Sequence, residues 1–350
     1  MLPSAAPAGA PPLVSVLMPV RDAAATLAAC VASIRRQRGP SWECVAVDDG
    51  SRDGSAAYLA QIAADDPRFR VLSQPPSGIV AALERGLREC RGRYVARMDA
   101  DDIMLARRLQ RQVEALVADP TLAGVGCHVR IFPRTRASNE PALGRREYEG
   151  WLNSLRSAED VARDAFVECP LAHPTFMLER SVLERHRYRD AGWPEDYDLV
   201  LRLLGAGLRL GVVPERLLCW RDGASRLSRT SPTYTIERFV RCKAHFLAQG
   251  LLGCSPDYIL WGYGKTGQKL ARALAALGKR PRAIIELHPG RIGQCILGAR
   301  VSSPSMLPEL LRQARLPIVV SVARPGPRGE VRAALAALEL VEGRDYVCAA

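Results

Sequence analysis

The sequence predicts an α/β protein with two domains: a three-layer α/β/α domain on a parallel sheet, followed by a small α/β domain. Short apolar runs alternate with stretches of helical periodicity over the first 120 residues, and the same rhythm restarts after Ser255. The chain has 350 residues, of which 48% are hydrophobic, which suffices for two cores. We therefore expect a disordered lead-in over 1–12, a first domain over 13–250 and a second domain over 255–350.

The charge and cysteine content narrow the classes of partner and compartment. The net charge is +12, but the basic residues are almost all arginines, scattered among acids rather than clustered with aromatics. This pattern argues against a nucleic-acid partner and favours phosphate-bearing small ligands. Ten cysteines occur without a Cys-x-x-Cys pair, which favours a reducing cytoplasm. No stretch is long enough to predict an integral membrane segment, and attachment to the inner face of a membrane stays open.

Three β-α units open the first domain. The expected strands are 13–20, 42–47 and 69–73, and the third leads through Gly78 into a helix over 79–90. Pro19 and Val20 end the first strand and Asp22 follows it, while Asp49 follows the second. Right-handed crossovers place the carboxyl ends of parallel strands on one edge, so Asp22, Asp49 and the acids 99–102 of the next strand should share a crevice. A fixed carboxylate such as Asp49 could read the N–H of a nucleobase, or it could form an Asx turn.

The fourth expected strand, 94–98, stops abruptly at three carboxylates, Asp99, Asp101 and Asp102. Asp99 and Asp101 alternate along an extended chain and project to one side. Because their mutual repulsion is relieved by a cation, and hard oxygen ligands favour Mg²⁺ or Mn²⁺, we predict a metal held here against a diphosphate. The alternative is a solvated turn that caps the following helix.

Later segments add further polar candidates. Glu195 and Asp196 begin a predicted helix, where the helix dipole favours ionised carboxylates, although either could simply be a capping acid. His173 precedes a strand, and a lone histidine is as readily structural as functional. Arg221 ends a strand over 217–221, and the polar segment 133–150 is expected to be a loop.

The motifs together resemble family 2 glycosyltransferases of the GT-A fold, in their order and spacing: Pro19 with Asp22, the run 47–51, Gly78, and the block 97–102. The resemblance implies binding of a nucleotide-diphospho-sugar, with Asp49 near the base, Asp99 near the ribose, and Asp101 on the metal with Asp99 beside it. The resemblance implies a donor site with these members: Pro19, Val20, Asp22, Asp49, Gly78, Asp99 and Arg221.

The same resemblance assigns roles on the acceptor side. The second acid of Glu195-Asp196 matches the family's catalytic base, which selects Asp196. His173, Trp193 and Glu195 correspond to the acceptor side, and Arg221 to a late strand whose arginine approaches the diphosphate. Glu84 departs from the pattern, since the family often has Asn there, which concerns the donor sugar more than the reaction class.

The tail carries Gly262, Gly264 and Gly267 in the Gly-x-Gly-x-x-Gly spacing, between an expected strand and an expected helix. Glu286 follows the last glycine by 286 − 267 = 19 residues, where an acid would meet a ribose hydroxyl. We therefore expect a small Rossmann-like domain whose nucleotide site is either functional or degenerate. The whole arrangement resembles the N-acetylglucosaminyltransferase-like proteins of family 2.

The predicted function is an inverting glycosyltransferase that moves a sugar, GlcNAc or another hexose, from a UDP-sugar to a hydroxyl, with Asp196 as general base. For the acceptor, the sequence leaves three classes open: a glycan, a lipid-linked molecule and a protein. One alternative is a non-catalytic nucleotide or dinucleotide sensor. Another is a nucleotidyltransferase, which would usually carry a Gly-rich basic loop, and no such loop follows Val20.

Overall fold

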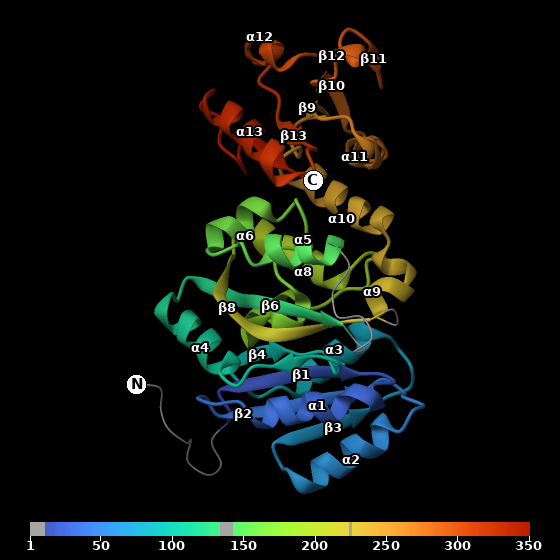
Figure 1. The fold of residues 1–350 in the computed structure, drawn as a ribbon, viewed down its shortest axis with the longest axis vertical. Helices are drawn as coiled ribbons and strands as arrows, with labels where there is room; N and C mark the ends of the chain where they lie inside the picture. Colours follow the sequence, from blue (N-terminus) through green and yellow to red (C-terminus); the bar gives the residue numbers. More distant parts are fainter. Residues whose placement is uncertain (1–10, 134–142, 224–225) are drawn as a thin grey trace. The chain divides into compact units, whose positions relative to one another are not determined.

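The computed structural model describes residues 11–133, 143–223 and 226–350, and the chain forms two compact units (Figure 1). The first unit takes the chain up to Arg226, except for the segments 162–170 and 191–205. Those two segments join 227–350 in the second unit. Nearly all of the lead-in predicted for 1–12 lies outside the described residues.

The first unit is built on an eight-stranded sheet in the order β3-β2-β1-β4-β7-β6-β8-β5. Its first four strands are mutually parallel, and they alternate with helices as the sequence predicts. These elements are β1 Val14–Val20, α1 Ala24–Arg35, β2 Trp42–Asp48, α2 Ser55–Asp65, β3 Phe69–Ser73, α3 Ile79–Glu89 and β4 Tyr94–Arg97.

Helices cover both faces of this sheet. Val16 and Met18 of β1 belong to the same buried cluster as Leu27 of α1. Leu17, which points the other way along the strand, faces Gly86 of α3, where a side chain would collide with it. Gly86 thus lets α3 pack closely on the sheet, and the predicted three-layer α/β arrangement is confirmed.

The sequence predicts a parallel sheet, but the second half of the sheet is mixed. β7 Met177–Glu179 runs antiparallel between β4 and β6 Leu122–Pro133, while β8 Arg209–Asp222 lies parallel to β6. The short β5 Ile103–Met104 pairs antiparallel with β8. The chain enters β7 directly from the 3₁₀ turn η1 His173–Thr175.

The segment expected to be a loop over 133–150 is partly helical. α5 Leu143–Leu152 covers its second half, and residues 134–142 lie outside the described part of the chain. Tyr148 and Trp151 of α5 pack partly buried against the core, which explains why a polar stretch folds as a helix. The first unit also contains α4 Arg108–Ala118, which contacts β6 and β8, and α7 Arg180–His186.

The second unit has a six-stranded sheet in the order β11-β12-β10-β9-β13-β14. All neighbours are parallel except β11, which pairs antiparallel at the edge. Its elements, in chain order, are α8 Glu195–Gly205, α9 Leu227–Thr230, η2 Pro232–Tyr234, α10 Ile236–Gln249, β9 Asp257–Trp261, α11 Lys265–Ala275, β10 Arg280–Ile285, η3 Pro289–Arg291, β11 Cys295–Ile296, β12 Ala299–Ser302, η4 Pro304–Met306, α12 Leu307–Gln313, β13 Ile318–Val320, α13 Pro325–Ala336 and β14 Tyr346–Cys348. α6 Ala158–Asp164 straddles the two units.

The division into units differs from the expected boundary between residues 250 and 255. Val240, Ala244 and Leu247 of α10 are buried in one cluster with Leu260 of β9 and Leu270 of α11. α8 in turn contacts α10. Because apolar surface is shared in this way, both helices belong to the second unit although they precede its sheet in the chain.

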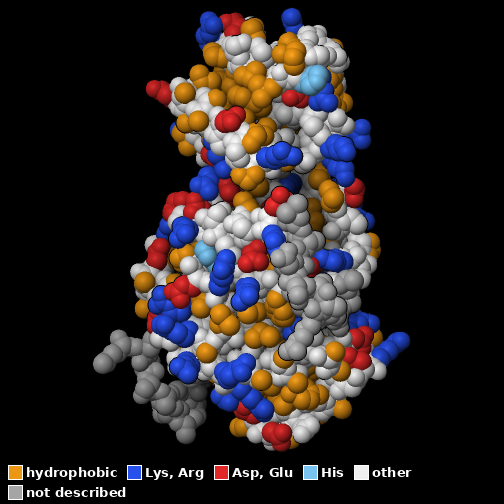
Figure 2. Space-filling view, in the orientation of Figure 1, with side chains coloured by type: hydrophobic (Ala, Val, Ile, Leu, Met, Phe, Trp, Pro, Cys, Tyr) orange, Lys and Arg blue, Asp and Glu red, His pale blue; other side chains and the backbone are white. Residues whose placement is uncertain are grey.

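The charge distribution of the surface and the length of the helices are relevant to nucleic-acid and membrane partners. On the face shown in Figure 2, Lys and Arg side chains are intermixed with acidic ones rather than gathered in one stripe. Among the described residues, no helix has both the length and the apolar character needed to cross a bilayer.

Candidate active site

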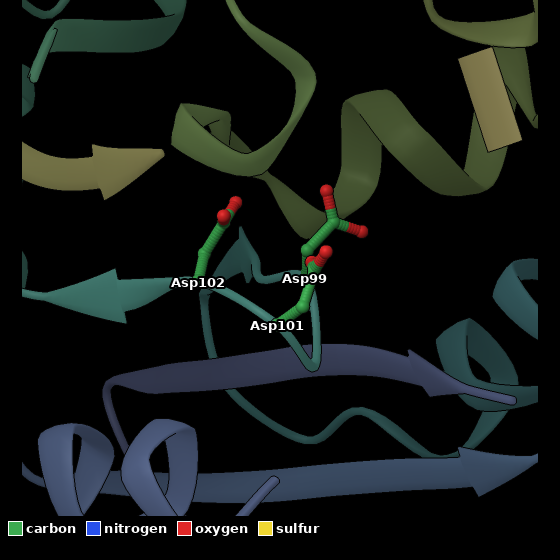
Figure 3. A group of neighbouring side chains, drawn as sticks. All are labelled: Asp99, Asp101 and Asp102. Atoms are coloured by element: carbon green, nitrogen blue, oxygen red, sulfur yellow. The ribbon is translucent and has the colours of Figure 1, made fainter. Parts of the chain in front are cut away.

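The carboxylates predicted to hold a metal do come together. β4 ends at Arg97, and the loop that follows carries Asp99, Asp101 and Asp102, whose side chains point to the same side (Figure 3). One carboxylate oxygen from each lies within 4.8 Å of the others. Three oxygens so close form a ligand set suited to a hard divalent cation.

The charges around this cluster are unequal. Burial raises the pKa of Asp99, but the ion pair with Arg97, together with the charges of Arg226 and His173, lowers it by more, so that Asp99 stays ionised. Burial and the charge of Asp99 raise the pKa of Asp101 and, more strongly, of Asp102. Oδ2 of Asp102 is buried and accepts no hydrogen bond from the described residues. A cation would offset the repulsion among the three groups, so the residues present fit a metal ion.

Arg221 ties this loop to strand β8. Its backbone N–H donates to Oδ1 of Asp102 at 2.7 Å, and its Nε donates to the carbonyl of Asp101 at 2.6 Å. Its guanidinium also lies 4.6 Å from the ring centroid of Phe132. The predicted approach of Arg221 to a diphosphate would therefore rely on its terminal nitrogens. Neither link to the acidic loop was predicted: Arg97 meets Asp99 two residues further along the chain, whereas the contact of Arg221 depends on a pairing that only the folded sheet creates.

The donor-site residues of the first two strands also lie near one another. Asp49 is 3% exposed, and its backbone N–H donates to the carbonyl of Val20 at 2.8 Å. Its carboxylate accepts bonds from the N–H groups of Ser77 at 2.8 Å and Gly78 at 2.9 Å. Oδ1 also accepts a bond from Nε2 of Gln74 at 2.7 Å, and Oδ2 accepts one from Nη1 of Arg21 at 3.3 Å, so each oxygen already accepts two hydrogen bonds. Asp49 thus fixes the loop that ends at Gly78, and its proposed contact with a base stays a prediction.

Asp22 and Pro19 lie beside this group. Asp22 adopts a left-handed backbone with φ of 47°, and its Oδ1 accepts a bond from the N–H of Arg52 at 2.7 Å. Pro19 pairs in register with Val47 on β2. The sheet therefore brings Pro19, Val20, Asp22, Asp49 and Gly78 to the same carboxyl edge, as predicted.

His173 is buried beside the acidic cluster. Its ring contacts Phe176 at 5.1 Å between centroids, and its Nε2 lies 3.1 Å from the hydroxyl of Tyr188. Its charge helps to lower the pKa of Asp99. These contacts agree with either a structural or an acceptor-side role, and the acceptor-side role stays a prediction.

Glu84, the position at which the motif departs from the family, has a structural partner. Its carboxylate forms an ion pair with Arg187 and accepts a bond from the N–H of Tyr188 at 2.8 Å. Glu84 therefore links α3 to the segment that also contacts His173.

The predicted base and its neighbours belong to the second unit, whereas the acidic cluster belongs to the first. Asp196 is half-buried in the first turn of α8, and its Oδ1 accepts a bond from the N–H of Tyr197 at 2.7 Å. Glu195 is 3% exposed and accepts a bond from the hydroxyl of Tyr234 at 2.5 Å. Trp193 donates from Nε1 to Asp198 at 2.9 Å. Glu195 and Trp193 thus hold the beginning of α8, and Asp196 is the more accessible acid of the pair.

In the tail, Gly262 and Gly264 of the predicted nucleotide site lie between β9 and α11, and Gly267 lies in the first turn of α11. Glu286, the predicted ribose ligand, forms an ion pair of 3.1 Å with Arg291. The carboxylate is therefore already engaged, which the sequence spacing could not reveal.

Known proteins resemble this chain in sequence and in fold. The model of the family described as glycosyl transferase family 2 matches residues 15–187. The putative glycosyltransferase EpsE of Bacillus subtilis is 29% identical over 237 residues, which are 65% of this chain and 80% of that protein. The Escherichia coli protein named UDP-Glc:alpha-D-GlcNAc-diphosphoundecaprenol beta-1,3-glucosyltransferase WfgD is 30% identical over 213 residues, 51% of this chain and 82% of that protein.

Among solved structures, residues 1–349 of S. aureus TarS in complex with UDP-GlcNAc superpose with a TM-score of 0.51 at 14% identity, covering 75% of this chain and 71% of that one. At this identity the likeness concerns the fold, and it agrees with the predicted GT-A architecture. The acidic loop at the end of β4 and the names of the sequence relatives both indicate a glycosyltransferase. The chain therefore belongs to glycosyltransferase family 2 and is a sugar-transferring enzyme.

Proposed function

We propose that this enzyme transfers a sugar, GlcNAc or another hexose, from a UDP-sugar to an acceptor hydroxyl with inversion at the anomeric carbon. The cluster of Asp99, Asp101 and Asp102 carries the proposal, because its three oxygens suit the cation that accompanies a nucleotide diphosphate. The choice of uridine is supported by the name of the E. coli relative, which specifies UDP-Glc, and by the UDP-GlcNAc complex of TarS.

The proposed roles follow the chemistry of each group. Asp101, with Asp99 beside it, would hold Mg²⁺ or Mn²⁺, and this ion supplies positive charge to the departing diphosphate. Asp49 would meet the base, and the terminal nitrogens of Arg221 would add charge near the phosphates. Asp196 would take the proton of the acceptor hydroxyl, as the family pattern implies, with His173, Trp193 and Glu195 on the acceptor side. Inversion needs no enzyme nucleophile.

The donor assignment is tested by UDP binding and UDP release. We expect calorimetry to detect UDP binding that is tighter with Mn²⁺ than with a chelator, and Asp101→Asn to reduce this metal-dependent difference. Asp65→Asn is the matched control, because Asp65 is an exposed carboxylate on α2 outside the cluster. Equal UDP affinity with Mn²⁺ and with chelator would remove the metal role. Release of UDP from a panel of UDP-sugars then identifies the donor, and the anomeric configuration of the product tests inversion.

The base is tested by separating binding from turnover. We expect Asp196→Asn to keep donor affinity while transfer falls by roughly two to four orders of magnitude, the usual contribution of a positioned general base. Glu330→Gln, an exposed acid on α13 of the same unit, serves as control. Normal turnover by Asp196→Asn would reduce Asp196 to a helix cap. The acceptor class is identified by measuring sugar transfer by the parent enzyme to glycan, lipid-linked and protein acceptors.

A further inference from the structure

The sheet of the second unit changes direction next to the glycine-rich loop. From β9 in the middle, the chain steps outward to β10 and β12, and then returns to the other side of β9 to form β13 and β14. The crevice between β9 and β13, outside their carboxyl ends, is the point at which open α/β sheets bind ligands. Gly262 follows β9 and Ser321 follows β13, and the N–H of Ser321 donates to the carbonyl of Trp261 at 2.7 Å.

The three positions differ in whether the fold requires glycine there. Gly262 has φ of 93°, and a side chain there would meet the carbonyl of Ser321. A side chain on Gly267 would collide with the carbonyl of Gly262, so this glycine allows α11 to approach the loop. Gly264 has an ordinary φ of −71°, and a Cβ on it would have no atom within 4 Å. Packing within the protein thus explains Gly262 and Gly267, whereas only Gly264 leaves open space at the helix terminus.

The first turn of α11 offers unused donors. No residue in 11–133, 143–223 or 226–350 accepts a hydrogen bond from the N–H groups of Lys265, Thr266 or Gly267. The side chains of Lys265 and of Arg324, which follows β13, are exposed and form no ion pair with those residues. Backbone donors and unpaired cations together suit an anion.

Ser321 supplies an independent observation. Its side chain is 94% buried, and its Oγ has no hydrogen-bond partner among the described residues. This Oγ lies 3.1 Å from the position that a Cβ on Gly267 would occupy, so it faces the first turn of α11. A buried hydroxyl without a partner is costly unless something completes its hydrogen bonding.

The nearby acid does not oppose an anion. Glu286 is neutralised by Arg291, and its Oε2 also accepts a bond from the N–H of Tyr263 at 3.3 Å. Nη1 of Arg291 donates to the carbonyl of Tyr263 at 2.9 Å, which braces the glycine-rich loop. Glu286 thus maintains the loop, and a ribose hydroxyl would have to compete with Arg291 for it.

We propose that the second unit binds the diphosphate group of a nucleotide at the first turn of α11, between β9 and β13. The N–H groups of residues 265–267 and the hydroxyl of Ser321 act as donors, and Lys265 and Arg324 supply charge. Ligand binding here is separate from the proposed donor site at the acidic cluster of the first unit and involves no redox step. The same diphosphate chemistry occurs in ADP, in UDP and in the dinucleotide NAD⁺.

The test uses calorimetry on the full chain in a chelator, with ADP, UDP, NAD⁺ and inorganic pyrophosphate as probes. The informative variant is Gly264→Val, because its Cβ would enter the open space with no atom within 4 Å. Gly150→Val on α5 is the matched control, since a Cβ there also meets no atom within 4 Å. We expect at least one nucleotide to bind, its Kd to rise by about tenfold or more in Gly264→Val, which corresponds to about 1.4 kcal/mol, and Gly150→Val to leave it unchanged.

Two further variants separate the contributions. Lys265→Ala with Arg324→Ala should weaken every diphosphate probe and make the remaining binding less sensitive to salt. Glu286→Gln should change affinity for NAD⁺ less than Gly264→Val does, because Arg291 already occupies the carboxylate. Absence of binding by all three nucleotides, or equal Kd values for the parent and Gly264→Val, would overturn the proposal. Oxidation of NADH by the protein would overturn the statement that no redox step occurs.

Discussion

Replacing Arg97 by methionine should destabilise the protein, because the carboxylates of the acidic loop then repel one another without this countercharge. Arg97 is 3% exposed and forms the ion pair with Asp99, whose side chain is 25% exposed. The change removes this countercharge and leaves Asp99 beside Asp101 and Asp102. Breaking a buried ion pair from one side costs about 3–5 kcal/mol, and the partial exposure of Asp99 favours the lower end, about 3 kcal/mol.

This loss should appear in the melting temperature of the full chain. For a domain of this size, about 3 kcal/mol corresponds to a decrease of roughly 6–12 °C. A cation bound to the cluster would replace part of the missing charge, and a ligand at 100 times its Kd stabilises a protein by about 2.7 kcal/mol. We therefore expect Mn²⁺ to raise the melting temperature of Arg97→Met more than that of the parent, with Arg97→Lys intermediate in chelator. A melting temperature equal to that of the parent in chelator, or equal responses to Mn²⁺, would refute this reasoning.

Three other predictions follow from contacts elsewhere. Arg221→Met should raise the Mn²⁺ concentration needed for UDP binding by about tenfold, which is within the range for supporting residues of metal sites. Arg221→Lys should not restore the parent value, because lysine lacks the Nε that donates to the carbonyl of Asp101. Calorimetry over a series of Mn²⁺ concentrations measures both effects. Burial raises the pKa of Glu43, but bonds from Arg91 and Ser15 lower it by more, so its ionised form stabilises the fold above the unfolded pKa of about 4.3. Glu43→Gln should therefore lose about 1.5–3 kcal/mol at pH 7 in urea titrations, with the difference shrinking as the pH falls below about 4. Deleting 255–350 should leave Val240 and Leu247 exposed and make the truncated chain aggregate in light scattering, whereas a soluble monomer would show that α10 does not need the tail.

The sequence predicts best what local pattern determines. The four parallel strands, the acidic loop after Arg97 and the turn at Gly262 lie where the alternation of apolar runs and turn residues indicates. The antiparallel direction of β7 could not be read from Met177–Glu179, because three residues carry no information about their partners. α5 was missed for a similar reason, since its apolar contacts are made by Tyr148 and Trp151 within a mostly polar segment.

The candidate site was predictable to the level of residue type. Carboxylates at the end of β4 are visible in the sequence, whereas their partners are not: Arg97 reaches Asp99 by proximity, but Arg221 meets Asp102 at a sequence separation of 119. The engagement of Glu286 by Arg291 likewise depends on a turn of the folded chain. Pattern thus identifies the groups that do chemistry, and long-range pairing determines which of them are already occupied.

The repeated passage of the chain between the two units affects how the protein can fold during synthesis. α8 is complete once residue 205 has been made, but α10, which it contacts, ends only at residue 249. At translation rates of about 5–20 residues per second, the interval lasts roughly 2–9 s. Throughout it, Tyr197 of α8, which is fully buried in the finished protein, lacks Phe239 of α10, on which it packs with ring centroids 5.7 Å apart. The nascent chain therefore presents an apolar helix for seconds, a time in which a chaperone can bind it and a neighbouring nascent chain can capture it.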